Sequence, residues 1–586
     1  MKKLAALAVA VGVVTASCSG HGASSSMPPI GSAMASSGSN STRTATLATA
    51  PAGWANTNTQ ALKIANASDL GAASGSQSIT VRVGLALRNQ SQLASAVASG
   101  QQVADGTFMS TYAPTSASVS AVKTYLQSQG FSGITAESNN LIVSASGSIA
   151  QVQKAFNTSI HSYSGSGTSF IANTSPAYVP SSLSGVVVAV LGLNNLQAVK
   201  PTPHVTSCQV FGVSTPPQEC LRFYDPATFQ VAYDAGKTPT ASNTPVAIMA
   251  EGDPTQAISD FRLNEQKFGL PQVPVNRVQV GVPSTDTAGN SEWTLDMTYS
   301  SGIAQQVKAI YLYTTTSLTD SDITLEYNKW VTQHYTNIGN SSFGGCEFFP
   351  FLDGSMVLDD EMLLEGASHG QTMFASSGDN GGYCNNFVNT NGAPGGAPFV
   401  MYPASSPYVA AVGGTDLFSN ADGTYKGESS WEAGGGGLSQ FEYSPYWEQK
   451  AQPVSQNALS MRGVPDVAMD ASLETGAELW GGQAANGACT PCVTGGTSLA
   501  SPLSAGVWAR LQSAHGNKLG FAPVWYYNNF TQHAAGAANA GPPPWQPDGG
   551  FHDILSGTNG LYTAAPGYDY TTGLGSFDIA ILNGQV

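Results

Sequence analysis

The chain has 586 residues, only 10% of them charged, and its 21 basic and 37 acidic side chains give a net charge of −16. Its length predicts two or more domains. The acidic balance and the lack of any basic stripe argue against nucleic acid or an anionic membrane as a partner. So few charges suit an exported protein that works in acid, because protonated carboxylates leave few cations to repel one another. They suit an extracellular protein at neutral pH equally well.

The N-terminus, residues 1–18, has the pattern of an export signal. Two lysines precede an apolar stretch from Leu4 to Val14, and small residues follow it. This stretch is too short to span a bilayer, and no other stretch is long and apolar enough to be transmembrane. The small residues before Cys18 also resemble a bacterial lipoprotein cleavage site. We therefore expect secretion, with lipid anchoring at Cys18 as an alternative.

Composition divides the rest of the chain into four parts. Residues 19–70 are rich in Ser, Ala, Gly and Thr, which predicts a flexible spacer. Residues 71–196 alternate strands such as "SITVRVGLAL" with helical stretches such as "SVSAVKTYLQSQG", which predicts a compact α+β unit. Residues 197–221 contain several prolines and little periodicity, which predicts a linker. Residues 222–586 form the second predicted domain.

Apolar β runs in the second domain alternate with helical segments. Examples of these runs are "PVAIMAE", "VKAIYLYT" and "YVAAVGGT". Near-continuous apolar strands separated by helices are typical of an α/β fold, with a mostly parallel sheet and helices on both faces.

Two acids in "NSEWTLDM", Glu292 and Asp296, lie four residues apart behind Asn290 or Ser291 as a helix N-cap. On a helix this spacing places both carboxylates on one face. Like charges so close disfavour each other, so one of the pair is expected to hold a proton near neutrality. The alternative is a pair of solvated acids on an exposed helix.

A third acid, Asp379, follows the β-like segment "FASS" at a glycine-rich corner, where it could also be an ordinary Asx-turn residue. Ten residues earlier, His369 in "GASHGQT" superficially resembles the histidine box of subtilisins. We interpret His369 as a surface or packing residue.

The cysteines other than Cys18 are even in number, which predicts disulfides in an exported chain and leaves their pairing open. Cys489 and Cys492 form a lone C-x-x-C, for which zinc would need two more ligands at matching spacing. A structural role is favoured. The other cysteines are Cys208, Cys220, Cys346 and Cys384.

Ser498 lies in "TGGTSLASPLSAG", between a Gly-Gly-Thr turn and a run of small, helix-compatible residues. This is the setting of a nucleophile at a helix N-terminus. A serine hydroxyl attacks only when a base takes its proton. No histidine of the chain has a convincing setting, so the base is sought among the carboxylates.

The C-terminal region offers a metal site. "FHDILSG" supplies Asp553, and "APGYDYTTG" supplies Asp569 with exposed backbone at Gly567. Two carboxylates and turn carbonyls suit calcium, which takes six to eight hard oxygen ligands. A turn without metal is the alternative.

In this order, Glu292, Asp296, Asp379 and Ser498 resemble the sedolisin family of serine-carboxyl peptidases, in its kumamolisin-like form. The segments "YPASSPYVAAVGGT", "GVPDVAMDAS", "GGTSLASP" and "GYDYTTGLG" also resemble family signatures and occur in the family's order. The resemblance implies a subtilisin-like fold in which glutamate stands in place of histidine. It also implies that residues 71–196 are an activation prodomain.

The resemblance implies a role for each site residue. Ser498 is the nucleophile, Glu292 is the general base and later the acid, and Asp296 orients Glu292. Asp379 helps to hold the oxyanion, which requires it to be protonated. This is the mechanism of a Ser-His-Asp triad in which a carboxylate takes the place of the imidazole as the base.

The same resemblance implies one structural calcium ion. Its ligands would be Asp553, Ile554, Ala565, Gly567 and Asp569, with Ile554 and Gly567 supplying backbone oxygens. Ala565 stands where glycine is usual, which a carbonyl ligand tolerates if its φ is negative.

One position departs from the family pattern, and at another the match does not decide the role of the residue. Phe343 in "SSFGG" stands where the family has tryptophan or tyrosine, so a polar group is lost near the acids. Glu251 in "IMAEGDP" matches a further networked acid of some members, and could equally be a strand-end residue.

The expected protein is a secreted, acid-active, monomeric endopeptidase that acts on proteins or peptides and is made as a self-processing zymogen. Its own prodomain would block the cleft until acid releases it. One alternative is a neutral subtilisin-type Ser-His-Asp protease that uses His369. Another is a non-catalytic secreted binding protein on the same fold, against which the four intact site residues argue.

Overall fold

The computed structural model describes residues 49–62, 67–165, 168–197, 224–384, 398–449, 451, 461–484, 487–488, 491–537 and 549–585. They belong to one compact unit of the chain, residues 39–586. The predicted signal peptide, Cys18 and, apart from Gln197, the predicted linker lie outside the described residues.

The second domain is built on one large sheet. Within the described residues it has eight strands, in the order β11-β12-β10-β13-β15-β17-β18, and β21 also pairs with β17. All of these pairs are parallel except β17 with β18. The predicted mostly parallel sheet is confirmed. The strands are β10 (Val246–Glu251), β11 (Val275–Gln279), β12 (Ile310–Thr315), β13 (Ile338–Ser341), β15 (Thr372–Ser376), β17 (Ala410–Ser419), β18 (Tyr425–Ser430) and β21 (Val467–Asp470).

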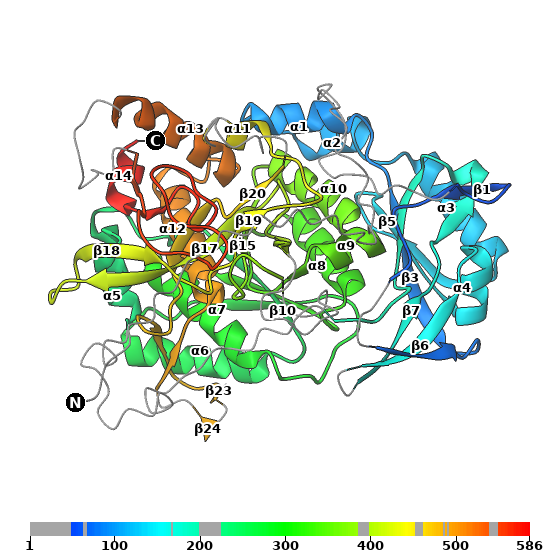
Figure 1. Ribbon diagram of the computed structural model, residues 1–586, viewed down its shortest axis with the longest axis horizontal. Helices are drawn as coiled ribbons and strands as arrows, with labels where there is room; N and C mark the ends of the chain where they lie inside the picture. Colours follow the sequence, from blue (N-terminus) through cyan, green and yellow to red (C-terminus); the bar gives the residue numbers. More distant parts are fainter. Residues whose placement is uncertain are drawn as a thin grey trace, which may run out of the picture. The chain divides into compact units, whose positions relative to one another are not determined.

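Helices cover the sheet on both faces (Figure 1). On one side α7 (Asn290–Ile303) packs against α12 (Thr497–Ala514) and α6 (Thr255–Phe268). On the other side α8 (Asp320–Gln333) packs against α10 (Ser355–Ser368). Every residue of α7 is buried although half of its sequence is polar, because other elements surround it.

Further helices and several short strands complete this domain. The helices are α5 (Pro226–Ala232), α9 (Phe348–Asp353), α11 (Tyr446–Gln449), α13 (Ala522–Ala537) and α14 (Ile579–Gly584). The short strands are β14 (Gly345–Cys346), β16 (Met401–Tyr402), β19 (Gly437–Leu438), β20 (Gly463–Val464), β22 (Ala477–Leu479), β23 (Gln483–Ala484), β24 (Gly487–Ala488), β25 (Cys492–Thr494), β26 (Phe551–His552) and β27 (Ser576–Phe577).

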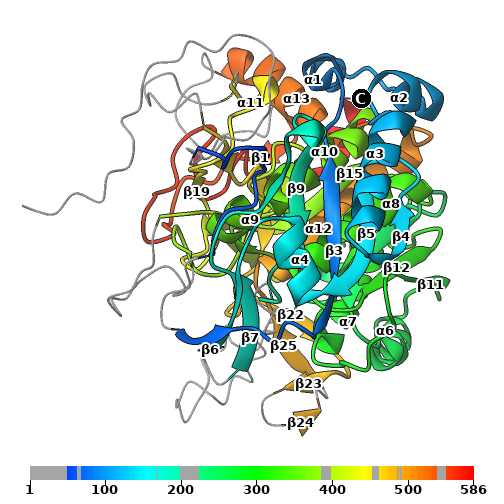
Figure 2. The same ribbon diagram turned by 90° about the vertical axis from the view of Figure 1, so that its right-hand side faces the viewer.

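The N-terminal domain is the predicted α+β unit. Its antiparallel sheet has the order β4-β5-β3-β9, and Figure 2 shows helices α3 and α4 over one face of it. Thr115 caps α3, and Ser148 with Gln151 forms a capping box on α4, so local sequence fixes where both helices begin. The elements are β3 (Ser78–Leu85), β4 (Ser132–Ala136), β5 (Ile142–Ser148), β9 (Val187–Leu191), α1 (Gln90–Ala98), α2 (Asp105–Thr111), α3 (Ser116–Ser128) and α4 (Ile149–Ala155).

The boundary at residue 70 needs correction, because part of the predicted spacer 19–70 is structured. Trp54–Asn56 (β1) pairs with Tyr178–Pro180 (β8), and Ser68–Ala72 (β2) joins a small sheet with β6 (Ile160–Gly165) and β7 (Thr168–Asn173). The Ser- and Ala-rich composition gave no sign of this. Strands this short are stabilised by partners far along the chain, such as Pro180 for Trp54 and Ser164 for Ser68, and not by their own pattern.

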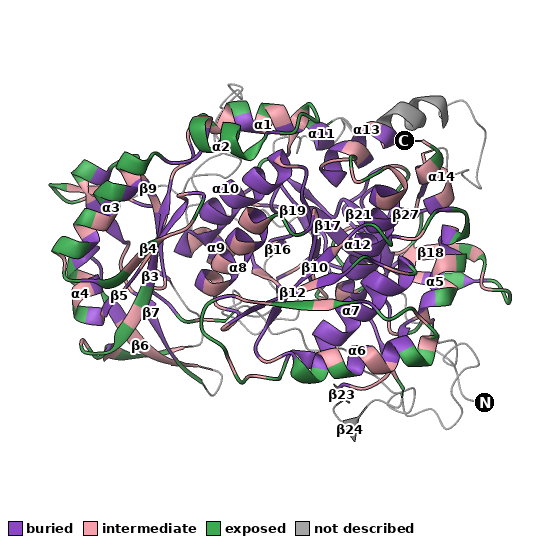
Figure 3. Cartoon of the chain, turned by 180° about the vertical axis from the view of Figure 1, so that it is seen from behind, coloured by how far each residue is buried: buried purple, intermediate pink, exposed green. Residues whose placement is uncertain are grey.

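The two domains share an extensive contact. Strand β3 alternates, so its apolar side chains face α3 and α4 while Arg82 points the other way and contacts Asp322 at 2.8 Å. Gly84 also faces α10, where an added Cβ would lie 2.7 Å from Leu358. Helix α10 is therefore buried on all sides although it carries acids (Figure 3). One of them, Glu365, accepts a 2.7 Å hydrogen bond from the Asn139 side chain.

One disulfide joins Cys346 to Cys384, with 5.4 Å between their Cα atoms. This confirms the prediction of disulfides. Cys492 is also disulfide-bonded, which supports the structural role of the C-x-x-C because a zinc ligand must be a free thiolate. Cys208, Cys220 and Cys489 lie outside the described residues. In the part of the chain that the structure describes, no helix has the length and apolar character that a membrane span requires.

Candidate active site

Ser498 is the second residue of α12 and is half-buried. Gly496 turns the chain into this helix with φ 91°, a left-handed value that favours glycine. A Cβ at this position would also lie 2.6 Å from Oδ2 of Asp379. The Ser498 hydroxyl donates a 3.3 Å hydrogen bond to the backbone carbonyl of Ser342. The prediction that Ser498 lies at a helix N-terminus is confirmed, and its role as nucleophile stays a prediction.

Glu292 and Asp296 lie one turn apart on α7, which faces α12. Their exposed fractions are 1% and 0%, so the alternative of solvated acids is wrong. The predicted N-cap is also wrong, because Gly289 takes that position and the helix begins at Asn290.

Burial is the main cause that raises the pKa of both acids. The pKa of Asp296 is also raised by the charge of Glu292, and the hydrogen bond from Ser342 opposes the shift. The pKa of Glu292 is raised further by the charge of Asp379, whereas hydrogen bonding with Ser498 lowers it. Glu292 lies in the first turn of α7, where the helix dipole favours an anion. Burial raises the pKa of Glu292 to about 8 and that of Asp296 well above its usual range, so Glu292 is the member of the pair that ionises more readily.

Ser342 belongs to the site but was not singled out in the sequence. Its hydroxyl donates a 2.6 Å hydrogen bond to Oδ1 of Asp296 and accepts a 3.0 Å bond from the Asn340 side chain. Ser501 on α12 in turn donates to Asn340 at 2.7 Å. The available signal was position, because Ser342 directly follows β13 and side chains at the carboxyl ends of parallel strands form sites.

Asp379 lies three residues after β15, beside the start of α12. Its Oδ1 accepts two hydrogen bonds of 2.8 Å from the backbone N–H and the hydroxyl of Thr497. These partners lie 118 residues away in the sequence, so Asp379 is more than a local Asx-turn residue. Oδ1 is thus occupied, while Oδ2 is the oxygen near Gly496.

Phe343 is 2% exposed and packs edge-to-face on Trp293, with 6.0 Å between the ring centroids. The indole N–H of Trp293 donates to the backbone carbonyl of Glu251 at 3.1 Å. At this position the aromatic ring serves packing. The side chain of Glu251 is buried at the end of β10, and its catalytic role stays a prediction.

His369 ends α10 and contacts the N-terminal domain. Its Nδ1 lies 2.8 Å from the carbonyl oxygen of Val103, and its ring packs edge-on against Phe108. These contacts support the interpretation of His369 as a packing residue.

The predicted calcium ligands lie on two neighbouring loops. Asp553 accepts a 3.0 Å hydrogen bond from the N–H of Gly567, and Asp569 accepts one of 2.9 Å from the N–H of Ala565. Burial, followed by the charge of Asp569, raises the pKa of Asp553 to about 6. The half-buried carboxylate of Asp553 and the buried carboxylate of Asp569 repel each other and form a hard-oxygen donor set, so these residues fit calcium. Ile554 is buried beside Asp553.

Comparison with known proteins shows which family the chain belongs to. The model of the pro-kumamolisin activation domain matches residues 65–196, and that of the subtilase family matches residues 280–539. The chain is 36% identical over 506 residues to sedolisin from Pseudomonas sp. (strain 101), which covers 82% of this chain and 80% of that protein. The chain belongs to the sedolisin family.

Other sedolisin-family proteins agree with this. Xanthomonalisin from Xanthomonas sp. (strain T-22) is 34% identical over 562 residues, which cover 86% of this chain and 65% of that protein. The structure of Pseudomonas sedolisin, a serine-carboxyl proteinase complexed with two molecules of pseudo-iodotyrostatin, covers 62% of this chain and 97% of that chain. It is 34% identical, with a TM-score of 0.55.

As a sedolisin-family member, the chain is a serine-carboxyl peptidase with an activation prodomain and a subtilisin-like fold. The predicted family, fold class and enzyme class are confirmed. The non-catalytic and neutral subtilisin-type alternatives have no support from these relatives.

Proposed function

We propose that the protein is a secreted, monomeric, acid-active endopeptidase, made as a zymogen that processes itself. The observation that carries this proposal is the contact between α7 and α12. It brings the buried pair Glu292 and Asp296 to the hydroxyl of Ser498.

In the acylation step, Ser498 Oγ forms a bond to the carbonyl carbon of the substrate and its proton passes to Glu292. The tetrahedral intermediate then collapses, the C–N bond breaks, and Glu292 returns the proton to the leaving amine. Water hydrolyses the acyl-enzyme by the same proton transfers in reverse order. Asp296, held by Ser342, keeps its proton and orients Glu292.

Asp379 would stabilise the oxyanion through Oδ2. Because Oδ1 already accepts two hydrogen bonds from Thr497, the proton needed for donation must be on Oδ2. An aspartate side chain in water is protonated only below about pH 4. The need for a neutral Asp379 therefore favours activity in acid, whereas the raised pKa of Glu292 limits how far the pH can fall before the base is protonated.

The prodomain would inhibit the enzyme before activation. Its close contact with α8, through Arg82, and with α10, through Gly84 and Asn139, supports this. The signal pattern of residues 1–18 supports secretion.

One structural calcium ion would be bound by the carboxylates of Asp553 and Asp569 and by backbone oxygens of Ile554, Ala565 and Gly567. The ion would supply positive charge between two mutually repelling carboxylates, one half-buried and one buried. Binding to the folded state alone would stabilise it.

The function is tested on purified full-length protein. After acidification, the wild-type chain should lose residues 71–196, whereas Ser498→Ala should keep them on a denaturing gel. The mature enzyme should cleave a denatured protein internally, with a bell-shaped pH–rate profile that falls before pH 7. Peak activity at pH 8, or normal processing of Ser498→Ala, would overturn the proposal.

A further inference from the structure

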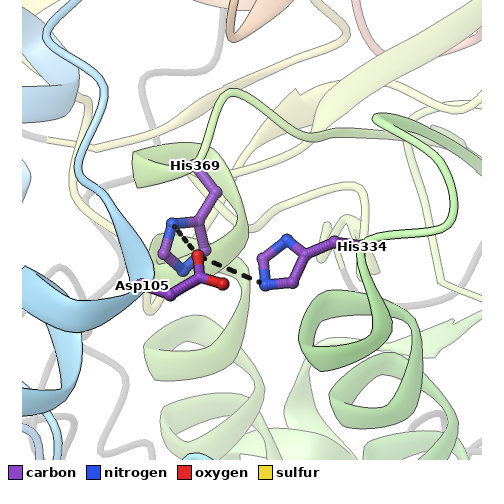
Figure 4. Close-up of side chains that lie close together, drawn as sticks. All are labelled: Asp105, His334 and His369. Carbon is purple, nitrogen blue, oxygen red and sulfur yellow. Dashed lines mark ion pairs between the residues drawn. The ribbon is translucent and has the colours of Figure 1, made fainter.

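Three side chains from both domains, Asp105, His334 and His369, converge at a place where none of the predicted catalytic residues lies. Asp105 is the first residue of α2 in the prodomain, whereas His334 and His369 follow the ends of α8 and α10 in the peptidase domain. Figure 4 shows the carboxylate of Asp105 between the two imidazole rings. One ligand atom from each of the three lies within 4.8 Å of the others.

The spacing of these atoms is that of ligands around an ion. Oδ1 of Asp105 lies 3.6 Å from Nε2 of His334 and 3.6 Å from Nδ1 of His369. Both distances are too long for hydrogen bonds. Around a tetrahedral zinc ion with bonds of about 2.1 Å, neighbouring ligand atoms are roughly 3.4 Å apart.

A pair elsewhere in the prodomain shows what a directly bonded histidine and aspartate look like in this protein. His161 Nδ1 lies 2.8 Å from Oδ2 of Asp69, a normal hydrogen-bond distance. The Asp105 cluster differs by a gap equal on both sides, as expected if the three groups are spaced for something between them.

The surroundings of His369 complete the arrangement. Its Nε2 lies 3.9 Å from Oε1 of the buried Glu365, on the ring edge away from Asp105. A carboxylate behind a metal-ligating histidine is common in zinc sites. To bind a metal, Nδ1 would have to give up its hydrogen bond to the Val103 carbonyl.

We propose that Asp105, His334 and His369 bind one zinc ion, or a divalent metal of the same class, which links the prodomain to the peptidase domain. Imidazole and carboxylate together are zinc ligands, and calcium would prefer an all-oxygen set. The metal would hold α2 against α8 and α10 and so oppose separation of the prodomain. This consequence for maturation rests on the proposed self-processing, whereas metal binding itself does not.

The test uses the full-length Ser498→Ala chain at pH 7.5, shown to be intact on a denaturing gel, so that zinc binding is measured separately from self-processing. Calorimetric titration with ZnCl₂ at pH 7.5, in the presence of excess calcium, should give one site per chain and a rise in melting temperature. Co²⁺ should give the visible absorption bands of a tetrahedral site. His334→Ala and Asp105→Asn, made in this background, should each weaken zinc binding tenfold or more.

Both substitutions are at accessible positions, with side-chain exposures of 32% for His334 and 70% for Asp105, so the variants should fold. His161→Ala is the matched control, because it removes a histidine paired with aspartate in the same prodomain and should leave zinc affinity unchanged. No zinc binding to the Ser498→Ala chain would overturn the proposal. So would equal affinity in the chain with and without His334→Ala and Asp105→Asn.

Discussion

The hydroxyl of Ser342 donates a 2.6 Å hydrogen bond to Asp296, so a residue that touches no substrate holds the inner acid of the catalytic pair. Ser342 is therefore a positioning residue. The carbonyl of the same residue accepts the hydrogen bond from Ser498. The loop after β13 thus contacts both the nucleophile and the acid pair.

Replacing Ser342 with alanine should lower kcat about tenfold, because a hydrogen bond to a buried acid contributes roughly 1.5 kcal/mol. The bond lowers the pKa of Asp296, so its loss should raise the pKa of the acid pair. The acid limb of the pH–rate profile should then move to higher pH. Ser504→Ala, a buried serine on α12 that bonds only within its helix in the described contacts, is the control. An unchanged acid limb would count against the positioning role.

Glu292→Gln should lower kcat by about 10³-fold or more, since the amide matches glutamate in shape but cannot accept the serine proton. The melting temperature should stay close to that of the wild type. His369→Gln, assayed in the mature enzyme, should change kcat little. The reverse pattern, with His369→Gln as the inactive variant, would restore the subtilisin-type mechanism.

Asp379→Asn should keep a neutral donor at every pH. The variant should be slower than the wild type, but its activity should decline less as pH rises. Asp379→Ala removes the donor altogether and should lose about 10²- to 10³-fold in kcat at all pH values. Identical alkaline limbs in the wild type and Asp379→Asn would show that Asp379 is not the group that limits activity at high pH.

The protein should be more stable in acid than at pH 8. Burial raises the pKa of Glu347 to about 7, from 4.5 in the unfolded chain, even though Ser439 and Gln440 donate hydrogen bonds to it. Folding therefore takes up a proton, and the resulting stability is present below about pH 4.5 and lost as pH rises through about 7. For Glu347 alone the difference is roughly 3 kcal/mol.

Urea unfolding of the Ser498→Ala chain at pH 5 and pH 8 measures this difference. Glu347→Gln should reduce the loss of stability between the two pH values. Glu474→Gln, at an exposed position, should leave it unchanged. Equal stability of the parent chain at both pH values would contradict the expectation.

Chelation of calcium should lower the melting temperature, and added calcium should restore it. Asp553→Asn should melt at a lower temperature than the parent and respond to neither treatment, because one of the two carboxylates is gone. Asp553 is the better position for this test, since Asp569 also accepts hydrogen bonds from Thr571 and Thr572 that any substitution would break. If the chelator does not change the melting temperature of the parent chain, the segment around Asp553 and Asp569 is an ordinary turn without metal.

The sequence by itself determined the features that depend only on neighbouring residues, namely the helices, the strands and the side chains that share a helix face. The spacing of Glu292 and Asp296 placed them on one face of a helix, and the small residues around Ser498 placed it at a helix N-terminus. Continuous apolar runs predicted the parallel sheet, because strands covered on both faces need no polar alternation. The family motifs then linked these pieces to one chemistry.

Only the tertiary structure decided the order of the strands and which side chains are neighbours. Helix period and strand alternation repeat every few residues, and they carry no information on the order of strands or on which loops meet at a sheet edge. The bonds from Thr497 to Asp379 and from Ser342 to Asp296 span 118 and 46 residues. The burial of α10 and the meeting of Asp105 with two histidines depend on docking of the prodomain, because each side chain taken alone is an ordinary polar residue at a helix end.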